Sequence, residues 1–278
     1  MGLALKAYAK LNLTLEISGR RPDGYHLLKS LVVAVDWADE VHLEPISRKR
    51  IELRCVPDLH IPHGENLVYR AAELLWKRFS PGVGVRIVLL KDIPMGAGLG
   101  GGSSDAAAAL AGLNELWGLG LDGEELVGLA RELGADVPFF LGESPAWMEG
   151  IGDILRPADE EVPPAFLVLV PPFPCPTPEV YRLYDELAER NPGPSGKYPN
   201  DLWPAALKLR PELSRYLEAL QGLGEIGVGM TGSGSALFAA FDGEDAAEWA
   251  MDELLERGVE GRLKLVRPRP RGYDFLQP

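Results

Sequence analysis

A dense run of glycines between residues 94 and 108 is the part of the sequence whose chemistry is easiest to predict. The run reads PMGAGLGGGSSDAAA, with five glycines in seven positions. Glycine lets the backbone come close to a ligand, and Ser103, Ser104 and Asp105 are residue types favoured at helix N-caps. A loop of this kind before a helix binds anions through free N–H groups and the positive end of the helix dipole. We therefore predict a phosphate site with a nucleotide as its ligand.

Three interpretations of this loop compete: a flexible turn before a helix, a dinucleotide-binding loop, and an ATP loop outside the Walker class. Gly96, Gly98 and Gly101 match the GxGxxG pattern. That fingerprint also needs an acidic residue at the end of a second strand, roughly 20 residues further on. Residues 118–125 instead indicate a helix end, a turn and a new capping box. Because the sequence contains no GxxxxGK[ST] motif, an ATP loop outside the Walker class is favoured.

Residues 94–108 resemble the phosphate loop of the GHMP kinases, a family that includes galactokinase, homoserine kinase and mevalonate kinase. Two further stretches are similar to motifs of that family: AKLNL at residues 9–13 and GMTGSGS at residues 229–235. The three motifs occur in the family's order and are spread across most of the chain. The triple glycine before the two serines is most similar to the branch whose acceptor carries a cytidine diphosphate group.

The resemblance implies an α+β, two-domain GHMP kinase fold. Its N-terminal domain is expected to resemble domain 2 of ribosomal protein S5, and its C-terminal domain to be ferredoxin-like, with the active site between them. Residues 159–164 are charged and proline-rich, which is typical of a linker. We therefore place an N-terminal ATP-binding domain at residues 1–160 and a C-terminal GHMP kinase domain at residues 161–278.

The resemblance also implies two catalytic residues. The segment GADVPFF at residues 134–140 matches the place where these kinases carry their catalytic aspartate, so Asp136 is expected to take the proton of the attacking hydroxyl. Judged by itself, Asp136 is equally well explained as the cap of a short helix. Lys10 lies on the polar face of an alternating strand, where a lysine usually meets solvent. The AKLNL match implies instead that Lys10 orients Asp136 and keeps its carboxylate ionised.

The same match implies how the nucleotide is held, with ATP and Mg²⁺ as the cofactors. The expected ATP-binding residues are those of the loop: Pro94, Met95, Gly96, Ala97, Gly98, Leu99, Gly100, Gly101, Gly102, Ser103 and Ser104. Ser104 is also the expected metal ligand, and the sequence identifies no acidic residue beside it. Asn66, at the start of a predicted helix, is expected to border the adenine.

The acceptor site is expected at Tyr25 and His26, which end a turn-rich loop. An aromatic ring beside a hydrogen-bonding ring suits recognition of a planar base, and the resemblance implies that this base is cytosine. Tyr25 would stack on it and His26 would hydrogen-bond to it. Thr177 and Tyr181 match the opposite wall, so that two tyrosines would sandwich the base, although core packing explains Tyr181 equally well. Asn12 projects to the same side as Lys10 and is expected to bind the substrate.

Hydrophobic periodicity and cap residues predict the elements that must position these groups. Strands are expected at residues 5–17, 28–35, 41–44, 51–56, 83–90, 166–170, 236–241 and 262–266, and a hairpin at 146–155. Helices are expected at 65–79, from the cap residues at 103–105 to about 117, at 123–133, from a Thr177 cap onward, at 202–209, 211–220 and 245–256.

Composition limits the class of protein. The 278 residues carry a net charge of −13, which argues against a nucleic-acid binder. A phosphate group must then be bound by backbone N–H groups, a metal ion and a few nearby cationic side chains. We find no segment that would span a membrane and no signal peptide, and Cys55 and Cys175 show neither a disulfide framework nor zinc spacing. We expect a cytoplasmic monomer or weak homodimer that binds a small-molecule substrate.

We predict an ATP-dependent kinase that phosphorylates this cytidine-bearing acceptor by direct in-line transfer, without a phospho-enzyme. The nearest alternative is another GHMP activity, such as a homoserine, mevalonate or sugar kinase. The RRPDGYH loop at residues 20–26 and the triple glycine favour the cytidine substrate. A nucleotide-binding protein without catalysis and an NAD-dependent enzyme are the remaining alternatives.

Overall fold

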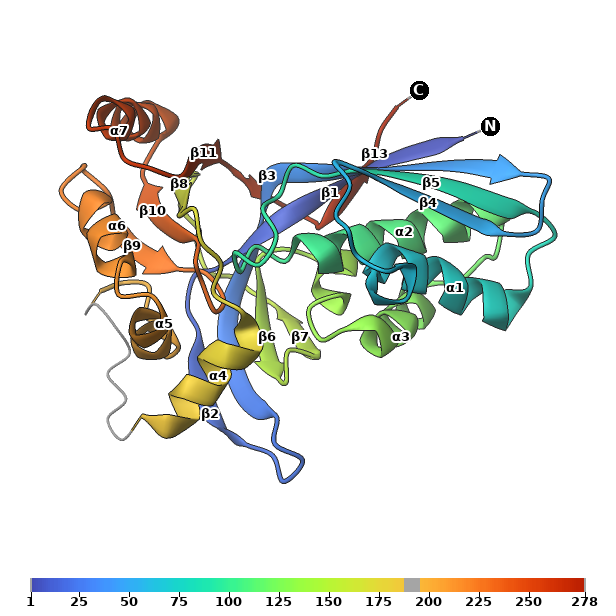
Figure 1. The fold of residues 1–278 in the computed structure, drawn as a ribbon, viewed down its shortest axis with the longest axis horizontal. Helices are drawn as coiled ribbons and strands as arrows, with labels where there is room; N and C mark the ends of the chain where they lie inside the picture. Colours follow the sequence, from blue (N-terminus) through green and yellow to red (C-terminus); the bar gives the residue numbers. More distant parts are fainter. Residues whose placement is uncertain (1, 188–195, 278) are drawn as a thin grey trace.

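The computed structural model describes residues 2–187 and 196–277, and each half of the chain is built on its own β-sheet (Figure 1). Helices cover one face of the first sheet and one face of the second. The expected α+β class with two domains is confirmed.

The first sheet has the strand order β13-β1-β3-β5-β4, and its long central strand β3 also carries shorter strands at its other end. The main strands are β1 (Leu3–Asn12), β3 (His26–Ile46), β4 (Ile51–Val56), β5 (Gly84–Leu90) and β13 (Tyr273–Phe275). The shorter ones are β2 (Glu16–Arg20), β6 (Ala146–Gly150), β7 (Ile154–Pro157) and β12 (Pro268–Arg269). Because β3 pairs with five of these strands, β1, β2, β5, β6 and β12, it connects the core of the first half to the junction with the second.

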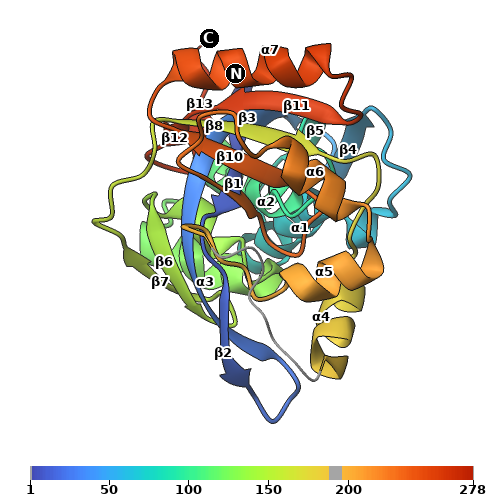
Figure 2. The same cartoon turned by 90° about the vertical axis from the view of Figure 1, so that its left-hand side faces the viewer.

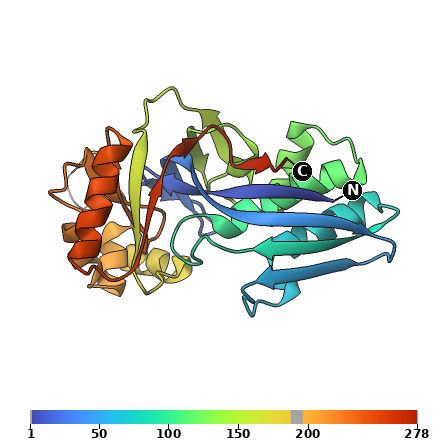
Figure 3. The same cartoon turned by 90° about the horizontal axis from the view of Figure 1, so that it is seen from above.

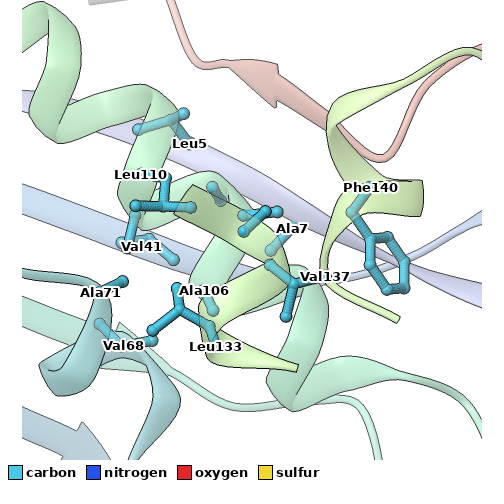
Figure 4. Close-up of a cluster of buried hydrophobic side chains, with 14 of the residues drawn as sticks. Leu5, Ala7, Val41, Val68, Ala71, Ala106, Leu110, Leu133, Val137 and Phe140 are labelled. Atoms are coloured by element: carbon cyan, nitrogen blue, oxygen red, sulfur yellow. The ribbon is translucent and has the colours of Figure 1, made fainter. Parts of the chain in front are cut away.

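Two helices pack on this sheet, α1 (Leu67–Phe79) and α2 (Gly101–Trp117), and α3 (Gly123–Leu133) packs against both of them. The central helix α2 is buried from Ser104 to Leu113. Its small side chains let it lie close to the strands, as Figure 4 shows for Ala106 and Leu110 beside Leu5 and Val41. The core therefore holds α2 from Ser104 onward, directly behind the residues that begin the helix.

The second sheet is antiparallel, with the order β11-β8-β10-β9. Its strands are β8 (Ala165–Val170), β9 (Gly227–Met230), β10 (Leu237–Phe241) and β11 (Arg262–Val266). Its helices are α4 (Thr177–Glu186), α5 (Trp203–Leu209), α6 (Leu213–Ala219) and α7 (Glu244–Glu256). Figure 2 shows α7 lying along this sheet. Every residue of β8 and β10 is buried, so these two central strands are covered on both faces. No helix in the described parts of the chain is both long enough and apolar enough to cross a bilayer.

A third hydrophobic cluster joins the two sheets and supports the glycine loop. Phe166 and Phe238 of the second sheet pack there with Leu11 and Val33 of the first. Three loop side chains are buried in the same cluster: Ile93, Ala97 and Leu99. The glycine loop is therefore a packed part of the interface between the halves, and not a flexible turn.

Two predictions about the first strands are wrong in their bounds. The alternation at residues 5–17 predicts one strand, but β1 ends at Asn12 and β2 begins at Glu16. Between them the regular pairing with β3 is interrupted: the Leu13 N–H still donates to the Leu31 carbonyl at 2.7 Å, but the Leu15 N–H donates to the Pro199 carbonyl at 3.0 Å. The segments predicted as two strands at 28–35 and 41–44 belong to the single strand β3.

Two predicted helix caps are also wrong. Helix α2 begins at Gly101, with Gly100 as N-cap in the left-handed region (φ 72°) and without a side-chain cap, so the three residues predicted as caps lie in its first turn. Helix α4 begins at Thr177 with Pro176 as N-cap. The Thr177 hydroxyl shares a hydrogen bond of 2.9 Å with the Ser233 hydroxyl instead.

The end of the chain returns to the first sheet, which the sequence did not indicate. Strand β13 pairs with β1 and strand β12 with β3. The two termini accordingly lie at the same end of the molecule (Figure 3). The proposed C-terminal domain at residues 161–278 thus carries a tail that completes the sheet of the N-terminal one.

Candidate active site

The glycine loop lines a cavity of about 400 Å³ at the junction of the two halves. In Figure 1 the loop joins β5 to α2 at the centre of the molecule. Lys10 and Asn12 reach the cavity from β1, and Asp136 from the turn after α3. Gly232 and Ser233 reach it from the second half of the chain. The cavity is therefore built by segments far apart in the sequence.

Glycine is required in this loop by backbone conformation and by close packing. Gly96, Gly98 and Gly100 have φ values of 66°, 77° and 72°, which side chains rarely tolerate. A Cβ on Gly98 would lie 2.2 Å from the Thr231 carbonyl oxygen, and one on Gly100 would lie 2.9 Å from Cγ of Lys10. The loop thus holds one shape, in contact with both halves of the chain.

The carbonyl groups of the loop bind the protein, and the helix N-terminus faces the cavity. The carbonyls of Ala97, Gly98 and Leu99 accept hydrogen bonds from Ala236 N–H (3.1 Å), the Thr231 hydroxyl (3.1 Å) and Lys10 N–H (3.0 Å). The first N–H groups of a helix have no intrahelical acceptor. Because α2 lacks a side-chain cap and its first three residues line the cavity, these donors are available to an anion.

Lys10 places a buried cation on the wall of this cavity. Its residue is only 4% exposed, and its ammonium donates to Asn12 Oδ1, while Asn12 Nδ2 donates to the Ser30 hydroxyl at 2.7 Å. Burial lowers the pKa of Lys10, and the negative charge of Asp136 opposes that shift. The ammonium is thus fixed in direction and electrostatically linked to Asp136.

Asp136 lies where two cavities meet. The second cavity, of about 570 Å³, extends toward the turn between β2 and β3. Both cavities are lined by Leu28, Asp136, Thr177 and Tyr181. Burial, followed by the charge of Asp136, raises the pKa of Tyr181 to about 12. A group bound in the second cavity would therefore approach the glycine loop past the Asp136 carboxylate.

The predicted base-binding residues line the second cavity. His26 Nε2 lies 2.7 Å from Asp185 Oδ1, and Arg20 pairs with the other oxygen of Asp185 at 3.2 Å. The ring of His26 lies 4.8 Å from that of Tyr181 at an interplanar angle of 32°. Tyr25 is 62% exposed. The predicted pair, Tyr25 and Tyr181, bounds the same cavity, but the ring that contacts Tyr181 here is His26.

Most of the predicted site residues line one cavity or the other, and two do not. Ser104 is fully buried and its hydroxyl donates to the Gly272 carbonyl at 3.5 Å, so the cavity hydroxyl of this pair is Ser103. Asn66 is the N-cap of α1, with its Oδ1 accepting from Val68 N–H at 2.9 Å. The position of Ser104 does not favour a metal contact. Asn66 lines a third cavity, of about 430 Å³, beside the end of β4, and its contact with adenine stays a prediction.

Three residues of the site were missed from the sequence. Thr231 was noted only as part of a glycine-rich stretch, yet it bonds both the loop and the Asn12 N–H (2.9 Å). Asp185 follows Tyr181 by four positions, so the helical period could have found it on the same face. Lys91 follows the buried strand β5 directly, and a charge at that place before the loop was a signal.

Comparison with known proteins identifies related sequences along the whole chain. The family described as GHMP kinases N terminal domain matches residues 66–143, and the family described as GHMP kinases C terminal matches residues 183–260. The 4-diphosphocytidyl-2-C-methyl-D-erythritol kinase of Thiobacillus denitrificans is 43% identical over 285 residues, covering 99% of each chain. The enzyme of the same name from Symbiobacterium thermophilum is 39% identical, covering 92% of this chain and 95% of its own.

Solved structures give the same result for the fold. A crystal structure of 4-(cytidine 5'-diphospho)-2C-methyl-D-erythritol kinase superposes with a TM-score of 0.79 at 39% identity, covering 95% of this chain and 98% of that one. A homoserine kinase from Cytophaga hutchinsonii superposes with a TM-score of 0.76 at 18% identity, covering 99% and 97%. The second likeness concerns the fold alone.

Replacing Lys10 by Met should leave the protein folded and make it more stable near neutral pH. The pKa of Lys10 is lower in the folded than in the unfolded chain, so the unfolded chain binds more protons, and this penalty fades as pH rises toward 10.5. Burying an ammonium costs several kcal/mol, and the loss of the hydrogen bond to Asn12 Oδ1, about 1–3 kcal/mol, offsets only part of the gain from removing it. The difference from wild type should shrink between pH 7 and pH 10.

Denaturant unfolding at several pH values measures this difference. Lys49→Met, at an exposed position in the turn after β3, is the control and should change neither the free energy of unfolding nor its pH dependence. A Lys10→Met protein that is less stable than wild type at pH 7 would show that the ammonium stabilises the fold.

Proposed function

The chain belongs to the GHMP kinase family, and we propose that it transfers the γ-phosphoryl group of ATP to the 2-hydroxyl of 4-diphosphocytidyl-2-C-methyl-D-erythritol. Relatives named for this activity match the chain over nearly its full length. The observation that supports the chemistry best is the position of Asp136 between the glycine-loop cavity and the Tyr25–His26 cavity. This reaction belongs to the non-mevalonate route to isoprenoid precursors.

The glycine loop would hold the phosphates of ATP. Its shape fits a phosphate chain because the glycines leave room beside the backbone, and because the uncapped N–H groups of α2 aim at the cavity. The residues proposed to bind ATP are those of the loop that line the cavity, from Pro94 to Ser103. We leave Ser104 out of this set because its hydroxyl is directed at Gly272.

Magnesium is proposed to enter with the nucleotide. Among the described residues no group of three or more histidine, cysteine or acidic side chains is arranged to hold a metal ion. The donors that fit are therefore the hydroxyl of Ser103 and the phosphate oxygens themselves, which suits Mg²⁺, an ion that keeps several waters. When bound, the ion neutralises charge on the phosphates.

Transfer then requires little from the protein beyond position and charge. Asp136 accepts the proton of the acceptor's hydroxyl. The oxygen of that hydroxyl forms a bond to the γ-phosphorus as the bond between the γ-phosphorus and the leaving ADP breaks. Lys10 lies beside both the loop and Asp136, where its ammonium orients the hydroxyl and stabilises charge on the transferring group. Transfer is direct, and no covalent phospho-enzyme is formed.

The cytidine end of the acceptor would occupy the second cavity. Tyr25 stacks on the base, and His26, held by Asp185, offers a ring of fixed orientation to its edge. Thr177 and Tyr181 form the wall between base and reaction centre, and Asn12 lies beside Lys10 at the reacting end. A cytoplasmic location and a monomeric or weakly dimeric state are part of this proposal.

Acceptor selection is tested by ADP release in a coupled assay. The cytidine substrate should give acceptor-dependent ADP, whereas homoserine and mevalonate should give none above the ATP-only background, because neither fills the second cavity. Equal turnover with homoserine or mevalonate would assign the chain to another activity of the family. ADP formation that never depends on an acceptor would contradict kinase activity altogether.

Asp136→Asn should lower kcat by about 10²- to 10⁴-fold, the usual contribution of a general base. Steady-state rates measure the loss, and thermal unfolding checks that the variant is folded. Asp159→Asn, on the exposed segment after β7, is the matched control and should keep wild-type turnover. A folded Asp136→Asn protein with near-normal kcat would remove this residue as the base.

Tyr25→Ala should raise the KM of the cytidine substrate and leave that of ATP unchanged. Stacking of a base on an aromatic side chain is worth about 1–3 kcal/mol, or roughly 5- to 150-fold in affinity. Trp249→Ala, at a residue of α7 that is 55% exposed, is the control for loss of an exposed ring. Equal losses for both substrates would contradict the stacking role.

A further inference from the structure

Beneath the glycine loop lies a cluster of three buried charged side chains that do not enter the reaction described above. Asp39 on β3 is fully buried, Asp105 in the first turn of α2 is 2% exposed, and the Lys91 side chain is 6% exposed. The Lys91 ammonium bonds to Asp39 Oδ2 and, at 2.7 Å, to Asp105 Oδ2. We call these three residues the loop clamp.

Asp39 fixes the residues that enter the glycine loop. Its Oδ1 accepts from the N–H groups of Asp92 (2.6 Å) and Ile93 (2.8 Å), the two residues before Pro94. Its other oxygen holds the ammonium of Lys91. One carboxylate therefore sets the direction of the backbone over three consecutive residues.

Lys91 joins this entry segment to the end of the loop. Asp105, its second partner, lies on α2 after the last glycine, so the ammonium spans both ends of the loop. A Cβ on Gly101 would lie 3.0 Å from Ile93 and 3.3 Å from Lys91 Nζ. Since the entry segment and the helix start touch, a shift of the clamp moves the N–H groups that face the phosphates.

The clamp has one more ionisable acid than base. Burial, reinforced by the charge of Asp39 and opposed by that of Lys91, raises the pKa of Asp105 well above its usual range. Burial alone would lower the pKa of Lys91, but the charges of Asp105 and Asp39 outweigh it and raise the pKa. Asp105 Oδ1 is also buried with no hydrogen-bond partner among the described residues, which is costly for a charged carboxylate. With Asp105 neutral, the cluster would add no net charge beneath the bound phosphates.

We propose that Asp39, Lys91 and Asp105 are positioning residues that set the affinity for ATP by holding both ends of the glycine loop, with Asp105 acting as a neutral partner. This inference rests on the proposed function. It adds that nucleotide affinity depends on side chains at the base of the loop; Lys91 also lines the glycine-loop cavity, but none of the three lines the acceptor cavity.

The first test is Asp39→Asn, which keeps the size of the side chain but removes the charge that holds Lys91. Displacing the loop by about 1 Å should lower kcat/KM for ATP roughly 10²-fold and weaken ATP binding in calorimetry, while the KM of the cytidine substrate stays within about twofold. Asp159→Asn is again the control. Should Asp39→Asn fail to fold, Asp105→Leu, which also removes a bond to Lys91, takes its place: ATP affinity should fall and the KM of the cytidine substrate should stay within about twofold.

The second test is Asp105→Asn, which matches a neutral carboxyl in shape and charge. It should keep the ATP affinity and KM of wild type within about twofold, whereas Asp105→Leu, which removes the bond to Lys91, should lose ATP affinity as Asp39→Asn does. Weak ATP binding by Asp105→Asn would show that a charged Asp105 is required and would overturn its neutral role.

Other outcomes distinguish a failure of the loop clamp from a failure of the proposed kinase function. Unchanged ATP affinity in the folded Asp39→Asn protein would overturn the clamp, even where Lys91→Gln loses affinity, because Lys91 would then act on phosphate directly. An equal rise in KM for ATP and for the cytidine substrate would also overturn the proposal, because a general loss of structure would produce that result. Calorimetry with ATP needs no acceptor, so it reports on the clamp even if the wild-type protein fails to phosphorylate the cytidine substrate.

Discussion

Two stretches of backbone from opposite halves of the chain pack directly against each other at Gly98 and Thr231, and the rest of the site is arranged around that contact. A Cβ on Gly98 would lie 2.2 Å from the Thr231 carbonyl oxygen, so no other residue fits without moving one of the two. Thr231 also bonds to the Gly98 carbonyl and to the Asn12 N–H. The phosphate loop, the strand of Lys10 and the second half of the chain are thereby fixed to one another.

This arrangement explains how a protein with a net charge of −13 can bind a polyanion. The positive potential is local: it comes from N–H groups at the start of α2 and from the ammonium of Lys10. Burying Lys10 opposes folding, as its lowered pKa shows. A buried ammonium is screened little by solvent, however, so it acts strongly on a charge that develops beside it. The residue that weakens the fold is the one that would strengthen catalysis.

The sequence allowed prediction of features that depend on local pattern. The glycine spacing indicates the loop, and the capping box from Asp122 to Glu125 marks the start of α3. The start of α2 was misplaced because serine and aspartate are common caps, whereas here Gly100 is the N-cap and Asp105 is bound by Lys91. Tertiary contacts overrode local preference at that point.

What could not be predicted depends on contacts between distant segments. The short strand β13 gains its partner from β1, at the other end of the chain. His26 and Asp185 are 159 positions apart, and only the fold brings them to 2.7 Å. The predicted domain boundary at residue 160 did not include the C-terminal strand that returns to the first sheet. A strand of three residues has too little periodicity to be recognised in the sequence.

The two cavities differ in how much of their structure exists before a ligand binds. On the nucleotide side, the loop is packed into the core through Ala97 and Leu99 and bonded along its carbonyls. On the acceptor side, His26 is held by Asp185 and Tyr181, while Tyr25 is 62% exposed. A base that binds in the acceptor cavity must order the side chain of Tyr25. Part of the free energy of binding the base therefore offsets the loss of side-chain freedom of Tyr25. Phosphate recognition is thus rigid and general, whereas the choice of acceptor depends on a surface completed by the acceptor itself.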